Sequence, residues 1–249
     1  MAQAQLPVPV IGSIVQMDWH STAEGETVLQ HFYNPQTSGR KLFGVLERPP
    51  VAPHIEEVSY KLFFAGKAGV GKTSTISRLA GTLPSASYIE TTGIRKTNIY
   101  WPVKIWDKII LFRLQCWDAG EHAVKKYGHI FPSCKSKSDG VVIIFSFMDE
   151  SSFAEVPNII SKVTKNDQSP PAVMVFGTRF CMSSKLEVSL NEIKELEQKY
   201  HVNVMKVNKV TSVSHDRNEV HRTAPLLNAI CEKLWIRDQE YILKNGMTV

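Results

Sequence analysis

The segment at residues 66–73, which reads GKAGVGKT, constrains this chain more than any other feature of its sequence. It fits the phosphate-binding loop pattern, in which two glycines, a lysine and a hydroxyl recur at fixed spacing. Gly66 and Gly71 allow the backbone to turn tightly enough for successive N–H groups to point at phosphates. Lys72 supplies a point charge for the terminal phosphates, and the Thr73 hydroxyl can ligate Mg²⁺. The pattern therefore predicts a site for a phosphate-bearing ligand.

The segments on either side of this loop have the order that the motif requires. Residues 60–64 form a short apolar run typical of a strand, and residues 73–80 are predicted to form a helix whose positive N-terminal end adds to phosphate binding. An ordinary glycine-rich turn can also join two elements, but strand, loop, lysine, threonine and helix together favour the phosphate loop. The predicted binding residues in this segment are Gly66, Lys67, Ala68, Gly69, Val70, Gly71, Lys72, Thr73 and Ser74.

The composition is that of one globular domain of ordinary size with a tail, since the chain has 249 residues, of which 43% are hydrophobic and 21% charged. The net charge of +5 is mild, and the basic residues are scattered. Short pairs such as Lys125 and Lys126 are typical of solvated surface, so we expect no nucleic-acid partner. The four cysteines form no C-x-x-C pair and are expected to be reduced rather than to bind zinc or form disulfides.

Membrane signals are missing from the sequence. No segment approaches the ~18–20 continuous apolar residues of a membrane span, and the first residues lack the pattern of a signal peptide. Residue 2 is Ala rather than Gly, and residues 245–249 contain no prenylation cysteine. We therefore expect a cytoplasmic protein without a lipid anchor, which reaches membranes only through partners.

Strands and helices alternate after the loop. The sequence predicts strands at 101–106, 109–117, 140–147, 172–176 and 204–207, and helices at 153–164, 190–200 and 224–244. The first two of these strands are expected to pair around a turn at Asp107 and Lys108. This alternation predicts an α/β fold with a mostly parallel, six-stranded sheet and helices on both faces. In such a fold the ligand lies beyond the carboxyl ends of the strands.

Residues 1–57 do not continue this pattern and are interrupted by prolines. One helix is predicted at residues 21–33, opened by Ser21 with Glu24 three residues on, as in a capping box. Apolar residues such as Trp19 argue against a wholly disordered tail. We expect an irregular extension that packs on the domain or on a partner, and a nucleotide-binding domain over residues 58–249.

The segment at residues 88–94, YIETTGI, resembles the first switch of Ras-superfamily small GTPases, especially the Rab form with its Thr-x-Gly-Ile. Thr91 follows Thr73 by 18 positions, which also matches the usual spacing in that family. The resemblance implies the G-domain fold of the P-loop NTPases. It also implies that Thr91 is a second hydroxyl ligand of Mg²⁺, closing over the terminal phosphate when GTP is bound.

Residues 114–122, LQCWDAGEH, resemble the strand-end aspartate and second switch of the same family, usually written Trp-Asp-Thr-Ala-Gly-Gln-Glu. The resemblance implies that Asp118 binds Mg²⁺ through water and that the Gly120 N–H reaches the terminal phosphate. One residue is missing between Asp118 and Gly120, and Glu121 stands where the family has the glutamine that orients the attacking water. Glu121 is therefore the candidate catalytic residue. Ala68 occupies a position that is usually glycine, where a methyl crowds an incoming arginine finger.

The base-recognition element also departs from the family. Residues 175–181, VFGTRFC, resemble its Thr-Lys-x-Asp motif, which assigns base contacts to Thr178 and Arg179. Cys181 replaces the aspartate that accepts two guanine N–H bonds, and a thiol accepts such bonds poorly, so base choice is expected to be weaker and broader. Lys209 matches the lysine of the second base loop. The resemblance implies GTP and Mg²⁺ as the ligands.

The chain as a whole resembles one branch of the superfamily, the Rab- and Rem-like small GTPases of a ciliogenesis and planar polarity effector complex. The resemblance extends from about Trp19 to about Asp238 and includes residues 18–25, 43–49 and 145–149. It implies partners resembling Fuzzy and Inturned at the basal body, a place in the cytoplasm and cytoskeleton, and roles in cilium formation, cargo transport, vesicle trafficking and exocytosis.

Two function classes remain open from the sequence. The first is a switching GTPase with slow hydrolysis, and the second is a nucleotide-bound interaction module that does not cycle. The phosphate loop, Thr91 and Asp118 serve both. Ala68 and Glu121 favour slow hydrolysis in either case. An ATPase or kinase with the same phosphate loop stays a third alternative because of Cys181.

Overall fold

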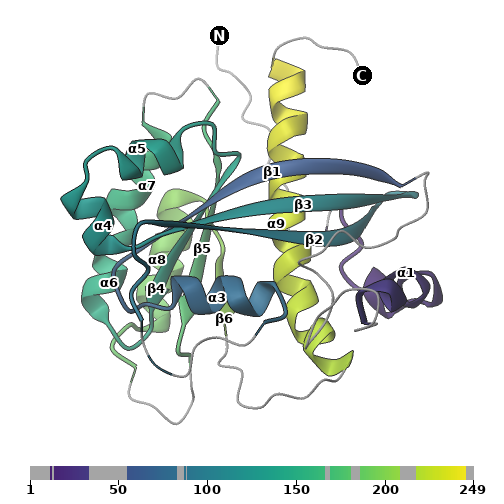
Figure 1. Ribbon diagram of the computed structural model, residues 1–249, viewed down its shortest axis with the longest axis horizontal. Helices are drawn as coiled ribbons and strands as arrows, with labels where there is room; N and C mark the ends of the chain where they lie inside the picture. The colour runs from purple at the N-terminus through teal and green to yellow at the C-terminus, as the bar shows by residue number, and fades with distance from the viewer. Residues whose placement is uncertain are drawn as a thin grey trace.

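A computed structural model describes residues 12, 14–33, 55–82, 87, 89–165, 169–180, 186–207 and 217–244 of the chain. Its strands form one six-stranded sheet in the order β2-β3-β1-β4-β5-β6 (Figure 1). The strands are β1 (Glu56–Ala65), β2 (Ile94–Ile105), β3 (Lys108–Ala119), β4 (Gly140–Ser146), β5 (Ala172–Thr178) and β6 (Val204–Val207). β2 runs antiparallel to β3, and all other neighbours are parallel, which confirms the mostly parallel sheet predicted from the sequence.

The helices lie on both faces of this sheet (Figure 1). After the short 3-10 helix η1 (Trp19–Ser21), they are α1 (Ala23–Tyr33), α3 (Lys72–Leu79), α4 (Glu121–Lys126), α5 (Ile130–Lys135), α6 (Glu150–Ala154), α7 (Val156–Thr164), α8 (Leu190–Tyr200) and α9 (Arg217–Lys244). None of these described helices is long and apolar enough to cross a membrane.

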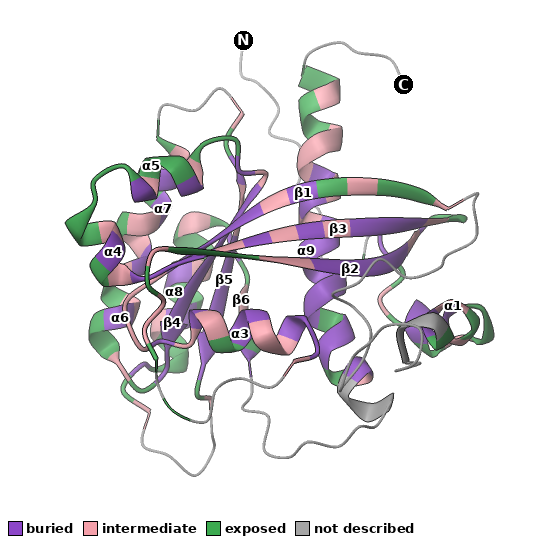
Figure 2. Cartoon of the chain, in the orientation of Figure 1, coloured by how far each residue is buried: buried purple, intermediate pink, exposed green. Residues whose placement is uncertain are grey.

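Two apolar cores fill the space between sheet and helices, one on each face, and the strand β4 in the middle of the sheet is buried along its whole length (Figure 2). Successive side chains of a strand point to opposite faces. Accordingly Leu62 and Phe64 of β1 pack with α3 and α9, while Phe63 and Ala65 pack with α4, α5, α7 and α8. β1 is central in the sheet, so the loop that follows it is held from both sides.

The described part of the N-terminal segment packs against the outer edge of β2 and against α9. Val15 forms a β-bridge with Ile105, the last residue of β2. The buried carboxylate of Glu232, on α9, accepts backbone N–H groups of Gly12, Ile14 and Val15 at 2.6, 2.9 and 3.1 Å. We call residues 12 and 14–17 the edge strap.

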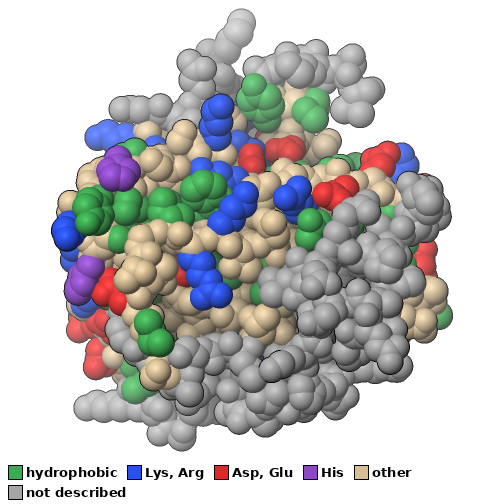
Figure 3. All heavy atoms as spheres, in the orientation of Figure 1, with side chains coloured by type: hydrophobic (Ala, Val, Ile, Leu, Met, Phe, Trp, Pro, Cys, Tyr) green, Lys and Arg blue, Asp and Glu red, His purple; other side chains and the backbone are tan. Residues whose placement is uncertain are grey.

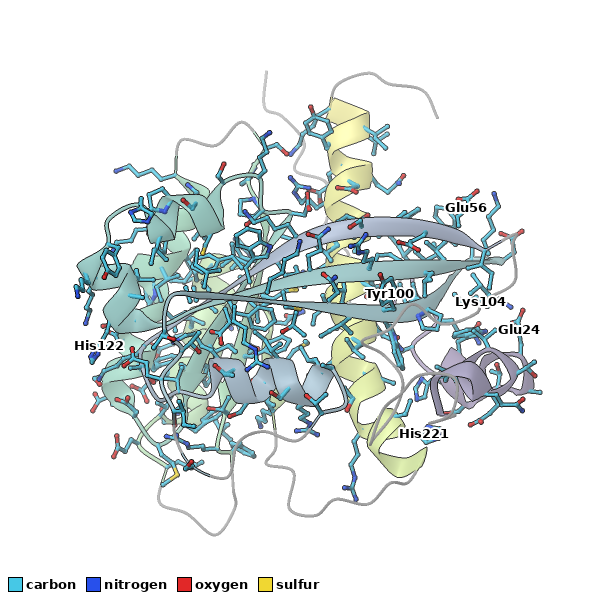
Figure 4. All side chains as sticks on the ribbon, viewed as in Figure 1. Glu24, Glu56, Tyr100, Lys104, His122 and His221 are labelled. Atoms are coloured by element: carbon cyan, nitrogen blue, oxygen red, sulfur yellow. The ribbon has the colours of Figure 1, made fainter. Side chains whose placement is uncertain are left out.

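The helix predicted at residues 21–33 begins later than expected. Ser21 ends η1, and α1 starts at Ala23. The Thr22 hydroxyl, rather than that of Ser21, accepts the Gly25 N–H at 3.1 Å. Glu24 is not part of a capping box, because it accepts the indole N–H of Trp19 and, as Figure 4 shows, meets Lys104 of β2. The tertiary ion pair thus replaces the local cap.

Other predicted boundaries shift for local reasons. The turn of the β2–β3 hairpin is at Trp106 and Asp107, one residue earlier than predicted, and Trp106 takes a positive φ of 54°. The helix predicted at 153–164 is two helices, with Pro157 in the first turn of the second. α9 begins at Arg217 rather than at residue 224, because packing on the sheet keeps it helical through Pro225. The short helices α4 and α5 are not predicted from the sequence.

Candidate nucleotide-binding site

The phosphate loop joins β1 to α3 and depends on glycine at its start. Gly66 has a φ of +141°, a conformation that L side chains rarely adopt. A Cβ atom there would lie 2.2 Å from the backbone oxygen of Ile144 in β4, so no larger residue fits. The sequence therefore folds the loop tightly against the sheet, and glycine is required by both φ and space.

Lys72 spans the loop that it follows. Its ammonium group donates hydrogen bonds of 2.9 Å to the carbonyls of Gly66 and Lys67. The residue is 8% exposed, and burial lowers the pKa of its ammonium, while the nearby carboxylates of Asp118 and Glu121 act in the opposite direction. A buried cation held by carbonyls at the mouth of an N–H-rich loop is suited to phosphate.

Three oxygen-bearing side chains from separate parts of the chain meet beside Lys72. The Thr73 hydroxyl donates to the Asp118 carboxylate and lies 3.0 Å from the Thr91 hydroxyl. The Thr91 hydroxyl donates to the same Asp118 oxygen at 3.1 Å. They come from α3, the segment before β2 and the end of β3.

This cluster fits Mg²⁺, which prefers oxygen ligands. Asp118 is 1% exposed, and its Oδ1 atom is buried with no hydrogen-bond partner among the residues that the structure describes. An unpartnered buried carboxylate oxygen is costly unless a cation or another donor meets it. The three residues that the sequence assigns to the metal therefore lie together, and Oδ1 of Asp118 is a buried oxygen that could accept a metal-bound donor or the metal itself.

A cavity of about 220 Å³ opens above the loop. Most of the predicted binding residues line it: Ala68, Gly69, Gly71, Lys72, Thr73, Ser74, Thr91, Gly120, Glu121 and Arg179. Four residues that the sequence analysis did not assign to the site also line it: Ser77, Ser87, Ile89 and Glu90. The position of Glu90, directly before Thr91, is the one sequence signal that points to it.

The remaining predicted residues contribute differently. The Lys67 ammonium contacts the Ser151 hydroxyl and lies 3.6 Å from the Asp149 carboxylate. The Lys67 side chain therefore does not point into the cavity. The Val70 side chain is buried in the core on the α3 and α9 face. In these two residues only the backbone is available to a ligand. Cys181 and Lys209 lie outside the described residues.

The end of β5 is tied to the phosphate loop from the side where the sequence places base recognition. The Thr178 hydroxyl contacts the Val70 carbonyl at 2.6 Å, and the Arg179 guanidinium donates to the Gly69 carbonyl at 2.6 Å. Arg179 has a positive φ of 58°, which turns the chain at the strand end. Both residues therefore support the loop directly.

The segment before β2 lies against the start of α4. A Cβ at Gly120 would lie 2.0 Å from the Thr91 carbonyl, so this close approach requires glycine. The Gly120 N–H, expected to face a terminal phosphate, donates instead to the Gly93 carbonyl at 3.3 Å. Glu90 accepts the His122 backbone N–H and contacts its ring nitrogen, both at 3.0 Å, while His122 itself lies at the outer edge of the molecule (Figure 4).

Glu121, the candidate catalytic residue, is held at the loop in an ionised form. Its carboxylate accepts the Ala68 N–H and pairs with Lys125 one helical turn on. Burial raises the pKa of this carboxyl, but the hydrogen bonds from Lys125 and Ala68 outweigh it and leave the pKa below its usual value. Lys125 is thus a partner of the site and not only the solvated surface residue that its sequence context predicts; its i, i+4 spacing from Glu121 is the sequence signal for this pair.

Basic side chains are dispersed on the face seen in Figure 3. There, lysine and arginine side chains of the described residues alternate with apolar, acidic and other polar ones rather than forming one patch.

Comparisons with known proteins agree with this geometry. A model of the Ras family matches residues 61–221. A Xenopus tropicalis protein named Ciliogenesis and planar polarity effector 2 is 38% identical over 250 residues, which cover 96% of each chain. The Homo sapiens protein of that name is 33% identical over 93% of each chain, and rat Ras-related protein Rab-13 is 28% identical over 63% of this chain and 74% of its own. The chain belongs to the Ras family.

Proposed function

We propose that this protein binds GTP with Mg²⁺ and acts as a switch or assembly subunit in cilium formation. The observation that carries the nucleotide part is the meeting of Thr73, Thr91 and Asp118 beside the buried ammonium of Lys72. Three separate segments supply these groups, and the family to which the chain belongs supplies the nucleotide class.

The roles of the residues follow from their chemistry. Lys72 and the loop N–H groups neutralise phosphate charge. Thr73 and Asp118 hold the metal, which when bound spreads the charge of the terminal phosphates. The Thr91 hydroxyl contacts the Thr73 hydroxyl and the Asp118 carboxylate, the groups proposed to hold the metal, so its position is proposed to depend on what occupies the site. This is the arrangement that a ligand-dependent switch needs.

Recognition of the base is a separate part of the proposal. Thr178 and Arg179, which are bonded to the phosphate loop, are proposed as base contacts, and Lys209 is proposed as a further base contact from sequence alone. With Cys181 in place of an aspartate, we expect Cys181→Asp to tighten GTP binding about ten-fold or more and to sharpen selection against ATP, since two charge-assisted bonds are gained. Competition binding with both nucleotides tests this, and equal tightening for ATP would mean that another group selects the base.

A non-cycling interaction module is the second candidate function. The specific observation in its favour is Glu121, which stands at the position of the catalytic glutamine and is already bonded to the Ala68 N–H. In that case bound GTP stabilises the surface that contacts a partner, and hydrolysis of GTP has no role in the function. Both candidates use the same site over residues 58–249, with residues 1–57 as a packing extension.

The cellular role is proposed from the relatives. Proteins named Ciliogenesis and planar polarity effector 2 match this chain over nearly its whole length. We infer that this chain also works with protein partners in that process, that the partners resemble Fuzzy and Inturned, and that it acts in the cytoplasm at the basal body and cytoskeleton. Vesicle transport and exocytosis are further roles within the same proposal.

Identifying the nucleotide carried by the purified protein is the first experiment. Chromatography of the extracted ligand should yield a guanine nucleotide, and Lys72→Ala should lose it. Lys135→Ala, on α5, is the matched control, because its ammonium contacts the Lys162 carbonyl away from the loop. An adenine nucleotide would overturn the assignment of guanine, and undiminished GTP affinity in Lys72→Ala would overturn the site assignment.

A further inference from the structure

The first residue of α4 places a carboxylate on the phosphate loop. The Glu121 side chain is 14% exposed, and its Oε2 atom accepts the backbone N–H of Ala68. Ala68, Glu121 and Lys72 all line the same cavity. One of the N–H donors that make such a loop attractive to phosphate is therefore already bonded to an anion of the chain itself.

The second oxygen of this carboxylate is held from the other side. Lys125 lies four residues further along α4, and its ammonium contacts Oε1 of Glu121. Residues at this spacing lie on the same face of a helix. Both oxygens of Glu121 thus have a partner, one on the loop and one on α4, and the side chain is fixed at the mouth of the cavity rather than free to turn outward.

A carboxylate and a phosphate cannot share one N–H donor. Two like charges a few ångströms apart repel more strongly in a partly buried site than in water, because the effective dielectric constant is lower there. The repulsion grows with the charge of the ligand, so it lowers the affinity for a nucleoside triphosphate more than the affinity for a diphosphate. Glu121 is therefore positioned to change the ratio of these two affinities.

We propose that the Glu121 carboxylate is an internal ligand of the phosphate loop, which competes with the terminal phosphate of a nucleoside triphosphate. Glu121 then sets how strongly the chain prefers the triphosphate over the diphosphate, and α4 moves away from the loop when the triphosphate binds. This inference rests on the proposed nucleotide site and adds to it a residue that determines specificity for the phosphate chain.

The test compares affinities for GDP and for a non-hydrolysable GTP analogue in wild type, Glu121→Gln and Glu121→Ala. Removing the competing anion should raise the ratio of analogue to GDP affinity about ten-fold in Glu121→Ala, with a smaller rise in Glu121→Gln, which keeps an acceptor oxygen but no charge. Glu155→Gln is the matched control: it removes a negative charge that also acts on Lys72, and it leaves the Ala68 hydrogen bond in place.

The amide resonance of Ala68 gives a second, structural measurement. In the GDP-bound wild type, this proton should carry the shift of a hydrogen bond to a carboxylate. It should move in Glu121→Ala, move in the wild type when the analogue replaces GDP, and stay in place in Glu155→Gln. Nucleotide binding with an unchanged affinity ratio in Glu121→Ala would overturn the inference and leave the proposed function intact. Failure of the wild type to bind either nucleotide would overturn the proposed function itself.

Discussion

The hydroxyl of Thr178, at the carboxyl end of β5, donates a hydrogen bond of 2.6 Å to the backbone carbonyl of Val70 in the phosphate loop. Thr178 is 7% exposed, so water competes little for this bond. The same hydroxyl lies 3.1 Å from the Phe145 carbonyl in β4. One side chain therefore joins the proposed base-recognition strand to the loop that is proposed to hold the phosphates.

Replacing this hydroxyl with a methyl should weaken both the fold and the site. In Thr178→Val the buried Val70 carbonyl loses its partner, and we expect the free energy of unfolding to fall by ~1–3 kcal/mol. Nucleotide affinity should fall as well, because the loop is less well positioned. Urea unfolding and nucleotide titration measure the two effects. Thr164→Val, which removes a hydroxyl that contacts the Ile160 carbonyl within α7, should leave affinity unchanged.

The core of this site could be predicted from the sequence because its signals are local. A loop pattern, a strand before it and a helix after it locate Lys72 and Thr73. The resemblance to the two switch motifs of the family, with the 18-residue spacing for the first, locates Thr91 and Asp118. The sheet follows from continuous apolar runs, of which β4 is buried at every position. Each of these inferences needs only neighbouring residues or a known register.

The missed features depend on tertiary contacts. Glu24 forms an ion pair with Lys104 of β2 instead of closing a capping box, and no residue near Glu24 in the sequence predicts this pairing. The hydrogen bond between Glu121 and Ala68 joins residues 53 positions apart. α9 passes through Pro225 because the sheet holds it, against local propensity. Local rules cannot predict contacts whose partners are distant in the chain.

The edge strap depends on one carboxylate. Glu232 is fully buried and accepts three backbone N–H groups of the strap. In Glu232→Gln one acceptor becomes a donor that faces an N–H group, so we expect a loss of ~1–3 kcal/mol in the free energy of unfolding and faster proteolysis within residues 14–33. Glu240→Gln on the exposed side of α9 is the matched control. Equal protease resistance in the Glu232 variant and the wild type would argue against the strap as a stabilising element.

Stability should fall on the acid side because of His20. This residue is 7% exposed, and its ring lies 5.3 Å from that of His221, which is labelled in Figure 4. Burial, and then the charge of His221, lower the pKa of His20 below 6.5, whereas a contact with the Met17 backbone and the charges of Asp18 and Glu26 act in the opposite direction.

The sign of the effect follows from this lowered pKa. The unfolded chain takes up the proton more readily than the folded chain, so the contribution of His20 is present above pH 6.5 and is lost as the pH falls through the folded-state pKa. We expect the free energy of unfolding to decrease between about pH 7.5 and 5.5, and to decrease less in His20→Gln. Urea unfolding at several pH values measures both slopes, and parallel curves would show that other groups cause the pH dependence.

Turnover of GTP by the isolated chain should be slow. An oriented water and an arginine finger together account for ~10³–10⁵ in rate where a helper protein acts. This chain has Glu121 at the position proposed to correspond to the glutamine, bonded to the Ala68 N–H. We also expect the Ala68 methyl to crowd an incoming finger. We expect single-turnover hydrolysis no faster than about 10⁻⁴ s⁻¹, the scale of slow intrinsic rates in such proteins.

The protein would then stay GTP-bound for long periods and be controlled by assembly with its partners. Single-turnover assays with and without those partners measure this, and rapid hydrolysis by the isolated wild type would refute the interaction-module alternative, because it would mean that the shortened switch still orients water.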